Sequence, residues 1–257
     1  MTFYKYHGTG NDFILFDNRE KKYSFTREQI AHMCHRRFGI GADGLMLLET
    51  EFDYDFRMVY YNADGGESTM CGNGGRCMVA FAKRLGIIEN NAKFIAIDGP
   101  HFATVSPEGV VSLQMQDVTG MEIHNGYTLL NTGSPHYVKW VKSTDDIDVF
   151  TDGRTIRQLP EFSPGGINVN FTQVMGDSLS VRTYERGVED ETMSCGTGVT
   201  AAAIAATCSL TGNFNTSVQT PGGELSVSFT KDSAHTAKNV ILTGPAAFVF
   251  EGTIYGI

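Results

Sequence analysis

Residues 67–74 read ESTMCGNG, and residues 191–198 read ETMSCGTG, so that four of eight positions are identical, including the pattern Cys-Gly-x-Gly. Each copy follows a predicted strand that ends in a tyrosine, Tyr61 or Tyr184, and each opens a predicted helix. Two copies separated by about half the chain indicate a duplicated domain, because a solenoid would need more and shorter repeats.

The rest of the pattern predicts many strands and few helices. We expect helices over residues 26–38, 73–85, 152–158 and 196–209, the first with Thr26 as its N-cap. Residues 199–206 read VTAAAIAA and carry no charge, which is typical of a helix that is buried on every side. A sheet wrapped around a central helix would bury it in this way, so the fold class is α+β.

Composition narrows the function. The 257 residues are 41% hydrophobic and 19% charged, as in ordinary globular proteins, and the formal net charge of −9 argues against binding to nucleic acid or to an anionic membrane surface. We see no signal peptide and no apolar stretch of about 20 residues. The five cysteines form no CxxC pair, which disfavours a disulfide framework or a zinc site. We therefore expect a cytoplasmic protein with reduced thiols.

The repeat places a thiol, Cys71 or Cys195, where a strand leads into a helix. The first turn of a helix offers unpaired N–H groups and the positive end of the helix dipole. A cysteine there can have its pKa lowered from ~8.5 to about 3.5–7.5, and the same N–H groups can hold a carboxylate. Each junction thus supplies a base and an anion site.

Two such junctions that face each other suit one reaction, the inversion of an amino acid at its α-carbon without a cofactor. One cysteine, as thiolate, would remove the α-proton from one face, and the other, as thiol, would return a proton to the opposite face. The developing carbanion needs donors aimed at the substrate carboxylate, which both helix starts could provide.

Other chemistry-bearing residues give weaker signals. Cys34, Cys77 and Cys208 lie inside predicted helices, where packing explains them. The glycine-rich segments 8–10 and 72–75 do not continue into a nucleotide-binding motif. His7 and His136 could each pair with a cysteine, or each could be a hydrogen-bonded loop histidine.

Several motifs together resemble those of the diaminopimelate epimerase family. They are HGTGNDF (7–13), GIGADG (39–44), NADG (62–65), MCGNGGR (70–76), GSPH (133–136), NVNF (168–171) and ERGV (185–188), followed by the second cysteine motif. The resemblance implies conversion of LL-2,6-diaminopimelate to the meso form, on the route to lysine and peptidoglycan. It also implies that Cys71 and Cys195 are the acid/base pair and that neither pyridoxal phosphate nor metal takes part.

The resemblance further implies two pseudo-symmetric halves, each a mixed sheet curled around a central helix, with the active site in the cleft between them. We place the first half at residues 1–118 and the second at 119–245. Residues 246–257 would form a last strand that returns to the first half. The partner is a small-molecule substrate, and a homodimer is one open expectation for the assembly.

The resemblance also assigns the substrate-binding residues, which are Asn11, Asn62, Gly72, Asn73, Asn168, Glu185, Arg186, Gly196 and Thr197. Chemistry supports the assignment, since Arg186 can bind a second carboxylate through two parallel hydrogen bonds and Glu185 can accept from an ammonium group.

Three departures from the family pattern concern this site. Gly44 stands where some members have a glutamine, and Ser134, two positions before the supporting His136, replaces an asparagine and reaches less far. The segment from Val188 to Glu191 is one residue longer than in some members. The repeat shows the same offset, since Tyr184 lies 11 positions before Cys195 and Tyr61 lies 10 positions before Cys71, which predicts a local bulge before Cys195.

Three other functions remain open. A proline racemase or hydroxyproline epimerase would share the two thiols but would have no use for Arg186 and Glu185. A cysteine hydrolase would use one thiol with His136, and would leave the duplication unexplained. A non-catalytic amino-acid-binding protein would tolerate the loss of both thiols.

Overall fold

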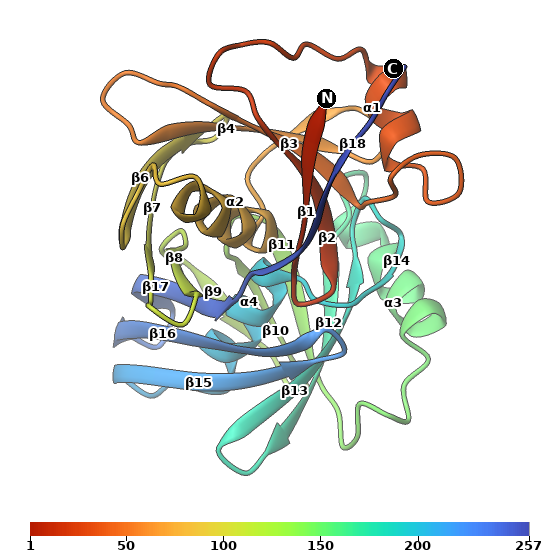
Figure 1. Ribbon diagram of the computed structural model, residues 1–257. Helices are drawn as coiled ribbons and strands as arrows, with labels where there is room; N and C mark the ends of the chain where they lie inside the picture. Colours follow the sequence, from red (N-terminus) through yellow and green to blue (C-terminus); the bar gives the residue numbers. More distant parts are fainter. Residues whose placement is uncertain (257) are drawn as a thin grey trace. The chain divides into compact units, whose positions relative to one another are not determined.

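In the computed structural model, which describes residues 1–256, strands outnumber helices and the chain divides into two units. Unit 1 is residues 1–113 together with the C-terminal segment from Gly244, and unit 2 is Gln114–Thr243. In Figure 1 the C-terminal strand runs beside the first strand of the chain.

The sheet of unit 1 is mixed. Its strands are β1 (Thr2–Gly8), β2 (Asn11–Asp17), β3 (Gly44–Glu49), β4 (Phe56–Asn62), β5 (Glu67–Ser68), β6 (Asn91–Ala96), β7 (Gly99–Val105), β8 (Val110–Gln114) and β18 (Ala247–Thr253). They pair in the order β18–β1–β2–β3–β4–β6–β7–β8, with β5 also on β4. The pairs β2–β3 and β4–β6 are parallel and the others are antiparallel.

Unit 2 repeats this topology pair by pair. Its strands are β9 (Met121–Ile123), β10 (Tyr127–Asn131), β11 (Pro135–Trp140), β12 (Asn168–Met175), β13 (Ser178–Glu185), β14 (Asp190–Thr192), β15 (Gly212–Thr220), β16 (Gly223–Ser233) and β17 (Thr236–Pro245). They pair in the order β9–β10–β11–β12–β13–β15–β16–β17, with β14 on β13, and β11–β12 and β13–β15 are parallel. The predicted α+β fold with two similar halves is confirmed.

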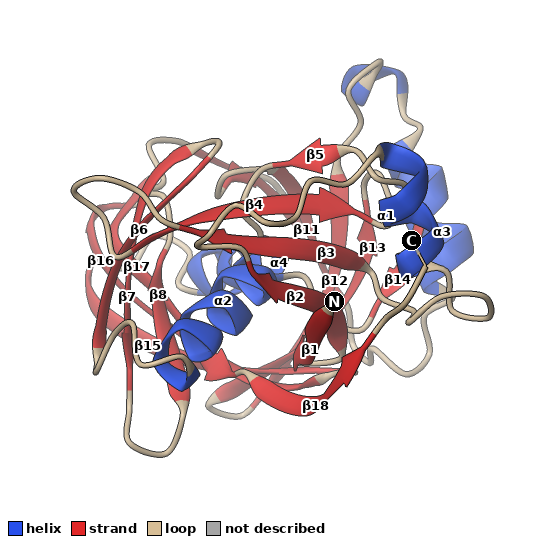
Figure 2. Cartoon of the chain, turned by 45° about the horizontal axis from the view of Figure 1, so that its top comes forward, coloured by secondary structure: helices blue, strands red, loops and turns tan. Residues whose placement is uncertain are grey.

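One helix lies inside each sheet, and both are seen within their strands in Figure 2. These are α2 (Gly72–Arg84) in unit 1 and α4 (Gly196–Ala206) in unit 2. Helix α4 packs on β10, β11, β12, β13, β15 and β16, so it contacts the sheet on several sides. Helix α4 carries no charged side chain, so its burial removes no charge from water.

Two shorter helices lie elsewhere, α1 (Arg27–Cys34) and α3 (Val149–Arg157). Helix α1 begins at the predicted N-cap, where Thr26 and Gln29 form a capping box. It ends at Cys34 rather than near Phe38, because His35 takes an extended backbone conformation at the C-cap. A short 3-10 turn, η1 (Pro160–Phe162), follows α3. No helix within residues 1–256 has the length and apolar character to cross a membrane.

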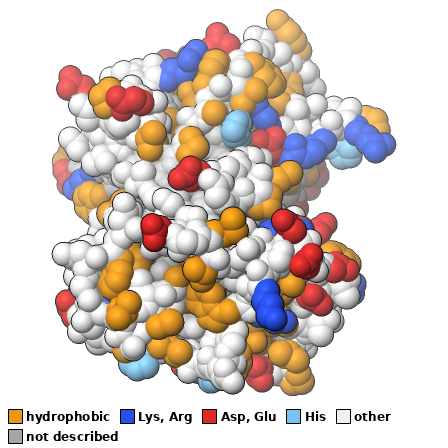
Figure 3. Space-filling model, turned by 90° about the horizontal axis from the view of Figure 1, so that it is seen from below, with side chains coloured by type: hydrophobic (Ala, Val, Ile, Leu, Met, Phe, Trp, Pro, Cys, Tyr) orange, Lys and Arg blue, Asp and Glu red, His pale blue; other side chains and the backbone are white. Residues whose placement is uncertain are grey.

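Acidic side chains lie among basic ones on the face that Figure 3 shows, and the basic side chains form no continuous surface there. This agrees with the sequence, which has 29 acidic and 20 basic residues. The face offers no broad cationic area for a polyanion.

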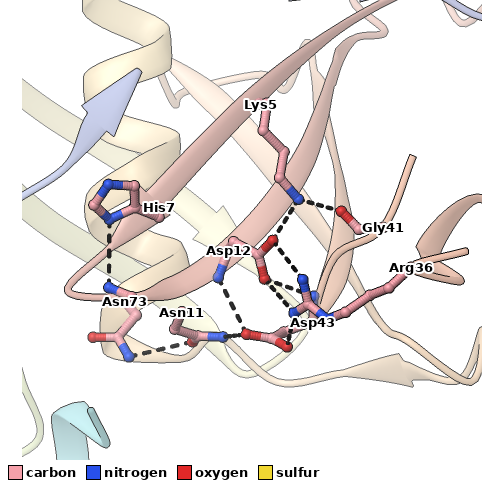
Figure 4. Close-up of polar contacts among 9 residues, drawn as sticks. Lys5, His7, Asn11, Asp12, Arg36, Gly41, Asp43 and Asn73 are labelled. Carbon is pink, nitrogen blue, oxygen red and sulfur yellow. Dashed lines mark hydrogen bonds and ion pairs between the residues drawn. The ribbon is translucent and has the colours of Figure 1, made fainter. Parts of the chain in front are cut away.

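Asp12 fixes the turn between β1 and β2 through two cations (Figure 4). Lys5 Nζ lies 2.6 Å from its Oδ2, and Arg36 donates to both carboxylate oxygens at 2.7 and 3.1 Å. Burial by itself raises the pKa of Asp12, but the hydrogen bonds and charges of Arg36 and Lys5 outweigh it and lower the pKa from 3.8 to about 2. The ionised form therefore stabilises the fold.

The tight packing of α4 predicts a penalty for added volume. Ala203 is fully buried, and added volume in a packed core is destabilising, so we expect Ala203→Leu to lower the free energy of unfolding by about 1–3 kcal/mol. Urea denaturation measures this. The matched control is Ala31→Leu in α1, where the alanine is only half-buried and the loss should be clearly smaller. Equal losses would contradict a closely packed central helix.

The lowered pKa of Asp12 predicts a pH dependence of stability. A carboxylate whose folded pKa lies below its unfolded value stabilises above pH ~4 and loses this contribution as the pH falls toward 2. We expect Asp12→Asn to cost about 1 kcal/mol at pH 7, after allowance for partial exposure, and to flatten the fall in stability between pH 4 and 2. Chemical denaturation across this range tests it, with the exposed Asp146→Asn as control. A parallel curve for Asp12→Asn would refute the coupling.

Candidate active site

Cys71 is the N-cap of α2 in unit 1 and is half-buried. Its backbone is extended, with φ −105° and ψ 149°, and its Sγ accepts a hydrogen bond from the N–H of Gly74 at 3.2 Å. A Cβ at position 74 would lie 3.1 Å from that sulfur, so a glycine at this position leaves room for the thiol. The assigned residues Gly72 and Asn73 form the first turn of the same helix.

The turn between β1 and β2 brings Asn11 to this helix start (Figure 4). Asn11 Oδ1 accepts from Asn73 Nδ2 at 3.2 Å, and Asn11 Nδ2 donates to Asp43 Oδ2 at 2.7 Å. The structure thus brings together the predicted residues Cys71, Asn73 and Asn11.

Arg76 lies fully buried one turn further along α2. Its guanidinium donates to Gly72 O at 3.1 Å, Asn73 Oδ1 at 3.0 Å and Thr9 Oγ1 at 3.2 Å. No carboxylate forms an ion pair with it among residues 1–256. Burial lowers the pKa of Arg76, while negative charge on Cys77 or Cys71 acts in the opposite direction.

Asn62 and Gly44 pair across β4 and β3. Asn62 is exposed at the end of its strand, and its N–H donates to Gly66 O at 2.9 Å. A Cβ at position 44 would lie 2.6 Å from both the Tyr61 carbonyl oxygen and the Tyr60 ring. The space of a side chain at position 44 is therefore taken by Tyr60 and Tyr61, which accounts for the glycine.

Cys195 is the N-cap of α4 in unit 2 and is 6% exposed. Its Sγ lies 3.4 Å from Thr197 Oγ1, and its side chain does not cap the helix as that of Cys71 does. Gly196 and Thr197 form the first turn of α4. A Cβ at Gly198 would lie 2.2 Å from Asn170 Oδ1, so the close approach of β12 requires glycine here.

Asn168 and Arg186 are held together near Ser134. Asn168 Nδ2 donates to Ser134 Oγ at 2.8 Å and to Pro135 O at 3.0 Å, while its Oδ1 accepts from the Arg186 N–H at 2.9 Å. Arg186 also donates to Ser134 Oγ at 3.3 Å and to Gly165 O at 3.4 Å. Ser134, although short, therefore contacts both assigned residues directly.

The guanidinium of Arg186 is otherwise exposed, and no carboxylate within residues 1–256 forms an ion pair with it. Glu185 Oε2 accepts from Thr192 Oγ1 at 2.9 Å. Arg186 can thus receive an anion that is not part of the protein.

His136 is fully buried in β11. Its Nδ1 lies 3.1 Å from Asn170 Nδ2, and its Nε2 has no hydrogen-bond partner among the described residues. Burial, with the positive charge of Arg186, lowers the pKa of His136 to about 3. Such a histidine stays neutral near pH 7 and is a weak general base there. His7, in contrast, accepts from the Gly10 N–H at 3.4 Å in the β1–β2 turn.

The predicted bulge before Cys195 is wrong. The β13–β14 pairing runs without a register shift from Thr183–Thr192 to Glu185–Asp190. The extra residue lies in the turn 186–189, where Glu189 has φ +60°, whereas the corresponding turn of unit 1 spans residues 63–65. A turn absorbs one residue at less cost than a paired strand, because no ladder hydrogen bond is lost.

Sequence reasoning missed the support that Asp43, Arg36 and Asn170 give to the assigned residues. A signal for Asp43 was present, because it lies within the GIGADG motif. Asn170 likewise lies within the NVNF motif, whereas Arg36 belongs to none of the quoted motifs and acts through contacts with Asp12 and Asp43. Among residues 1–256, no group of three or more His, Cys, Asp and Glu side chains is placed to hold a metal ion.

Comparison with known proteins extends over both units. Residues 3–121 and 128–249 match the diaminopimelate epimerase family. The diaminopimelate epimerase of Flavobacterium psychrophilum is 52% identical, with 99% of this chain and 100% of that protein covered, and that of Chlorobaculum tepidum is 43% identical, with 96% and 98% covered.

Solved structures share the fold at low identity. A PhzF-family phenazine biosynthesis protein of Bacillus anthracis has a TM-score of 0.78 at 14% identity, with 99% of each chain covered. A probable proline racemase from Agrobacterium radiobacter has a TM-score of 0.71 at 15% identity, with 99% of this chain and 92% of that chain covered. The resemblance found in the motifs is confirmed, and so is the expectation of an epimerase: the chain belongs to the diaminopimelate epimerase family.

Proposed function

We propose that the protein converts LL-2,6-diaminopimelate to meso-diaminopimelate without a cofactor, with Cys71 and Cys195 as the acid/base pair. One observation carries the proposal: in two units of the same topology, a cysteine stands at the N-cap of the enclosed helix. Membership of the family supports the substrate. The product would serve lysine and peptidoglycan synthesis in the cytoplasm, where thiols stay reduced.

The reaction needs one proton removed and one returned. The thiolate of one cysteine takes the α-proton, and the electron pair left on carbon spreads into the substrate carboxylate. The N–H groups of a helix start can stabilise that charge. The thiol of the other cysteine then gives its proton to the opposite face, which leaves that cysteine as the thiolate. In the reverse reaction the two cysteines exchange roles, so the one that gave a proton now removes one.

The assigned binding residues suit the two amino-acid ends of this substrate. Asn11 and Asn73 offer amide groups beside Cys71, and Asn62 lies at the end of β4. Arg186 has an exposed guanidinium for a carboxylate, and Asn168 and Ser134 hold it in place. Glu185 would accept from the distal ammonium group. The first turn of α4, Gly196 and Thr197, supplies backbone groups beside Cys195.

Two observations weigh against the alternatives. The exposed Arg186 favours a substrate with a second carboxylate, which proline lacks. The low pKa of His136 makes it a poor base for a cysteine hydrolase.

Removal of either thiol should stop the reaction. We expect Cys71→Ala and Cys195→Ala each to lower kcat for epimerisation by roughly 10²–10⁴-fold or more, since each removes an acid/base group. Proton NMR in D2O under reducing conditions measures the loss of the α-proton signal and the appearance of the meso isomer. Cys208→Ala, at an exposed position outside the helix starts, is the control and should keep wild-type turnover.

The outcome separates the candidate functions. Turnover by one single-cysteine variant at the wild-type rate would reject the two-thiol mechanism. Exchange with L-proline but not with diaminopimelate would instead assign a proline racemase.

The mechanism also predicts the pH dependence of activity. Catalysis needs one cysteine ionised and the other protonated, so kcat/KM should fall at low pH, where both are thiols, and at high pH, where both are thiolates. A bell-shaped profile with slopes near one on each side is expected. A profile that stays flat from pH 6 to 9, with the α-proton removal rate-limiting as shown by a deuterium isotope effect, would refute the paired thiols.

A further inference from the structure

We propose that Asp43 is a positioning residue that fixes the amide of Asn11 in one orientation for substrate binding, with Arg76 fixing Asn73 from the other end. The inference rests on the proposed function, in which the Asn11 side chain binds the substrate. It concerns residues of unit 1 only, and all of them except Arg76 are labelled in Figure 4.

The orientation of Asn73 is set by Arg76. A guanidinium only donates hydrogen bonds, so the group of Asn73 that faces it at 3.0 Å must be the carbonyl oxygen Oδ1. The amide nitrogen of Asn73 then points to Asn11, and the 3.2 Å contact is a donation to Asn11 Oδ1. Burial of Arg76 keeps water from replacing this contact.

Asp43 fixes the orientation of the Asn11 amide from the side opposite Asn73. A carboxylate only accepts, so the group of Asn11 at 2.7 Å from Asp43 Oδ2 must be the amide nitrogen. Arg36 lies 2.6 Å from the other oxygen of Asp43, and the Asp12 N–H donates to Oδ2 at 3.2 Å. The two oxygens of Asp43 are thus each engaged, and the carboxylate cannot turn away from Asn11 without losing contacts.

A flipped amide would meet repulsion at both ends. With oxygen and nitrogen of Asn11 exchanged, its carbonyl oxygen would face the Asp43 carboxylate and its N–H group would face that of Asn73. The observed orientation leaves one lone pair of Oδ1 and one N–H of Nδ2 for a ligand. These are the groups needed by an ammonium and a carboxylate, the two charged parts of one amino-acid end.

The positioning role of Asp43 is distinct from a contribution to the stability of the fold. The Asp43 side chain is 44% exposed and that of Arg36 is 59% exposed, and ion pairs at such positions contribute little to stability. What the pair supplies is a fixed direction for a hydrogen-bond donor on a side chain whose amide can otherwise rotate.

The experiment is a double-mutant cycle on the epimerisation of LL-diaminopimelate. Asp43→Asn keeps the shape but can donate to Asn11 Oδ1, so it removes one of the two repulsions that oppose the flip. We expect it to raise KM roughly 10-fold and to change kcat by less than about 3-fold, as for lost binding common to the ground and transition states. In an Asn11→Ala background the same change should have no further effect on KM.

Controls separate positioning from stability. Asp17→Asn removes an ion pair of the same kind in the same unit, Asp17 with Arg19 at 2.7 Å, and should leave KM unchanged. Asp43→Ser is a second variant, whose hydroxyl is too short to reach Asn11, and should match Asp43→Asn. The Tm of each variant is measured alongside, and the assays are run well below it.

Each outcome decides the inference. An unchanged KM in Asp43→Asn, or effects of Asp43→Asn and Asn11→Ala that multiply in the double variant, would overturn it. A large loss of Tm in both Asp43 variants would also overturn it, since Asp43 would then support the fold. Failure of the proposed function is distinguishable, because the wild-type protein itself would then show no α-proton exchange with diaminopimelate.

Discussion

The start of a buried helix is the constraint on which the rest of this structure depends. Helices α2 and α4 lie inside their sheets, and the first turn of each has N–H groups with no acceptor within the helix. A buried helix end needs an N-cap or a ligand to accept from these groups. Both helices have a cysteine at this position, but only the side chain of Cys71 makes a capping hydrogen bond. In the proposed mechanism, the same position holds an acid/base thiol beside N–H groups that can bind a carboxylate.

The two units share topology but differ in side chains around that position. Cys71 accepts from Gly74 N–H, whereas Cys195 lies beside the Thr197 hydroxyl. The β1–β2 turn supplies Asn11, and the equivalent β10–β11 turn supplies Ser134, which holds Asn168 and Arg186 instead. The duplicated topology thus carries different side chains at the two helix starts.

The sequence could predict what depends on local pattern. The uncharged stretch 199–206 indicated a buried helix, and the capping box at Thr26 marked the start of α1. It could not predict contacts between distant segments, which decide the end of α1, the four-residue turn after Glu185 and the environment of His136. The bulge was wrongly predicted for this reason: residue counting finds an insertion, but only the strand register locates it.

The buried charge of Arg76 influences the electrostatics at the start of α2. A fully buried guanidinium with no ion pair among residues 1–256 is costly, and burial lowers its pKa accordingly. Oxygen acceptors of Gly72, Asn73 and Thr9 compensate in part, and each of them belongs to the helix start or to the turn beside it. A further acceptor, Pro245 O, lies 3.4 Å from Arg76 Nε. Negative charge on Cys71 acts against the lowering of the Arg76 pKa by burial. In the proposed mechanism, the same buried cation would stabilise the negative charge that proton removal from an α-carbon creates near the start of α2.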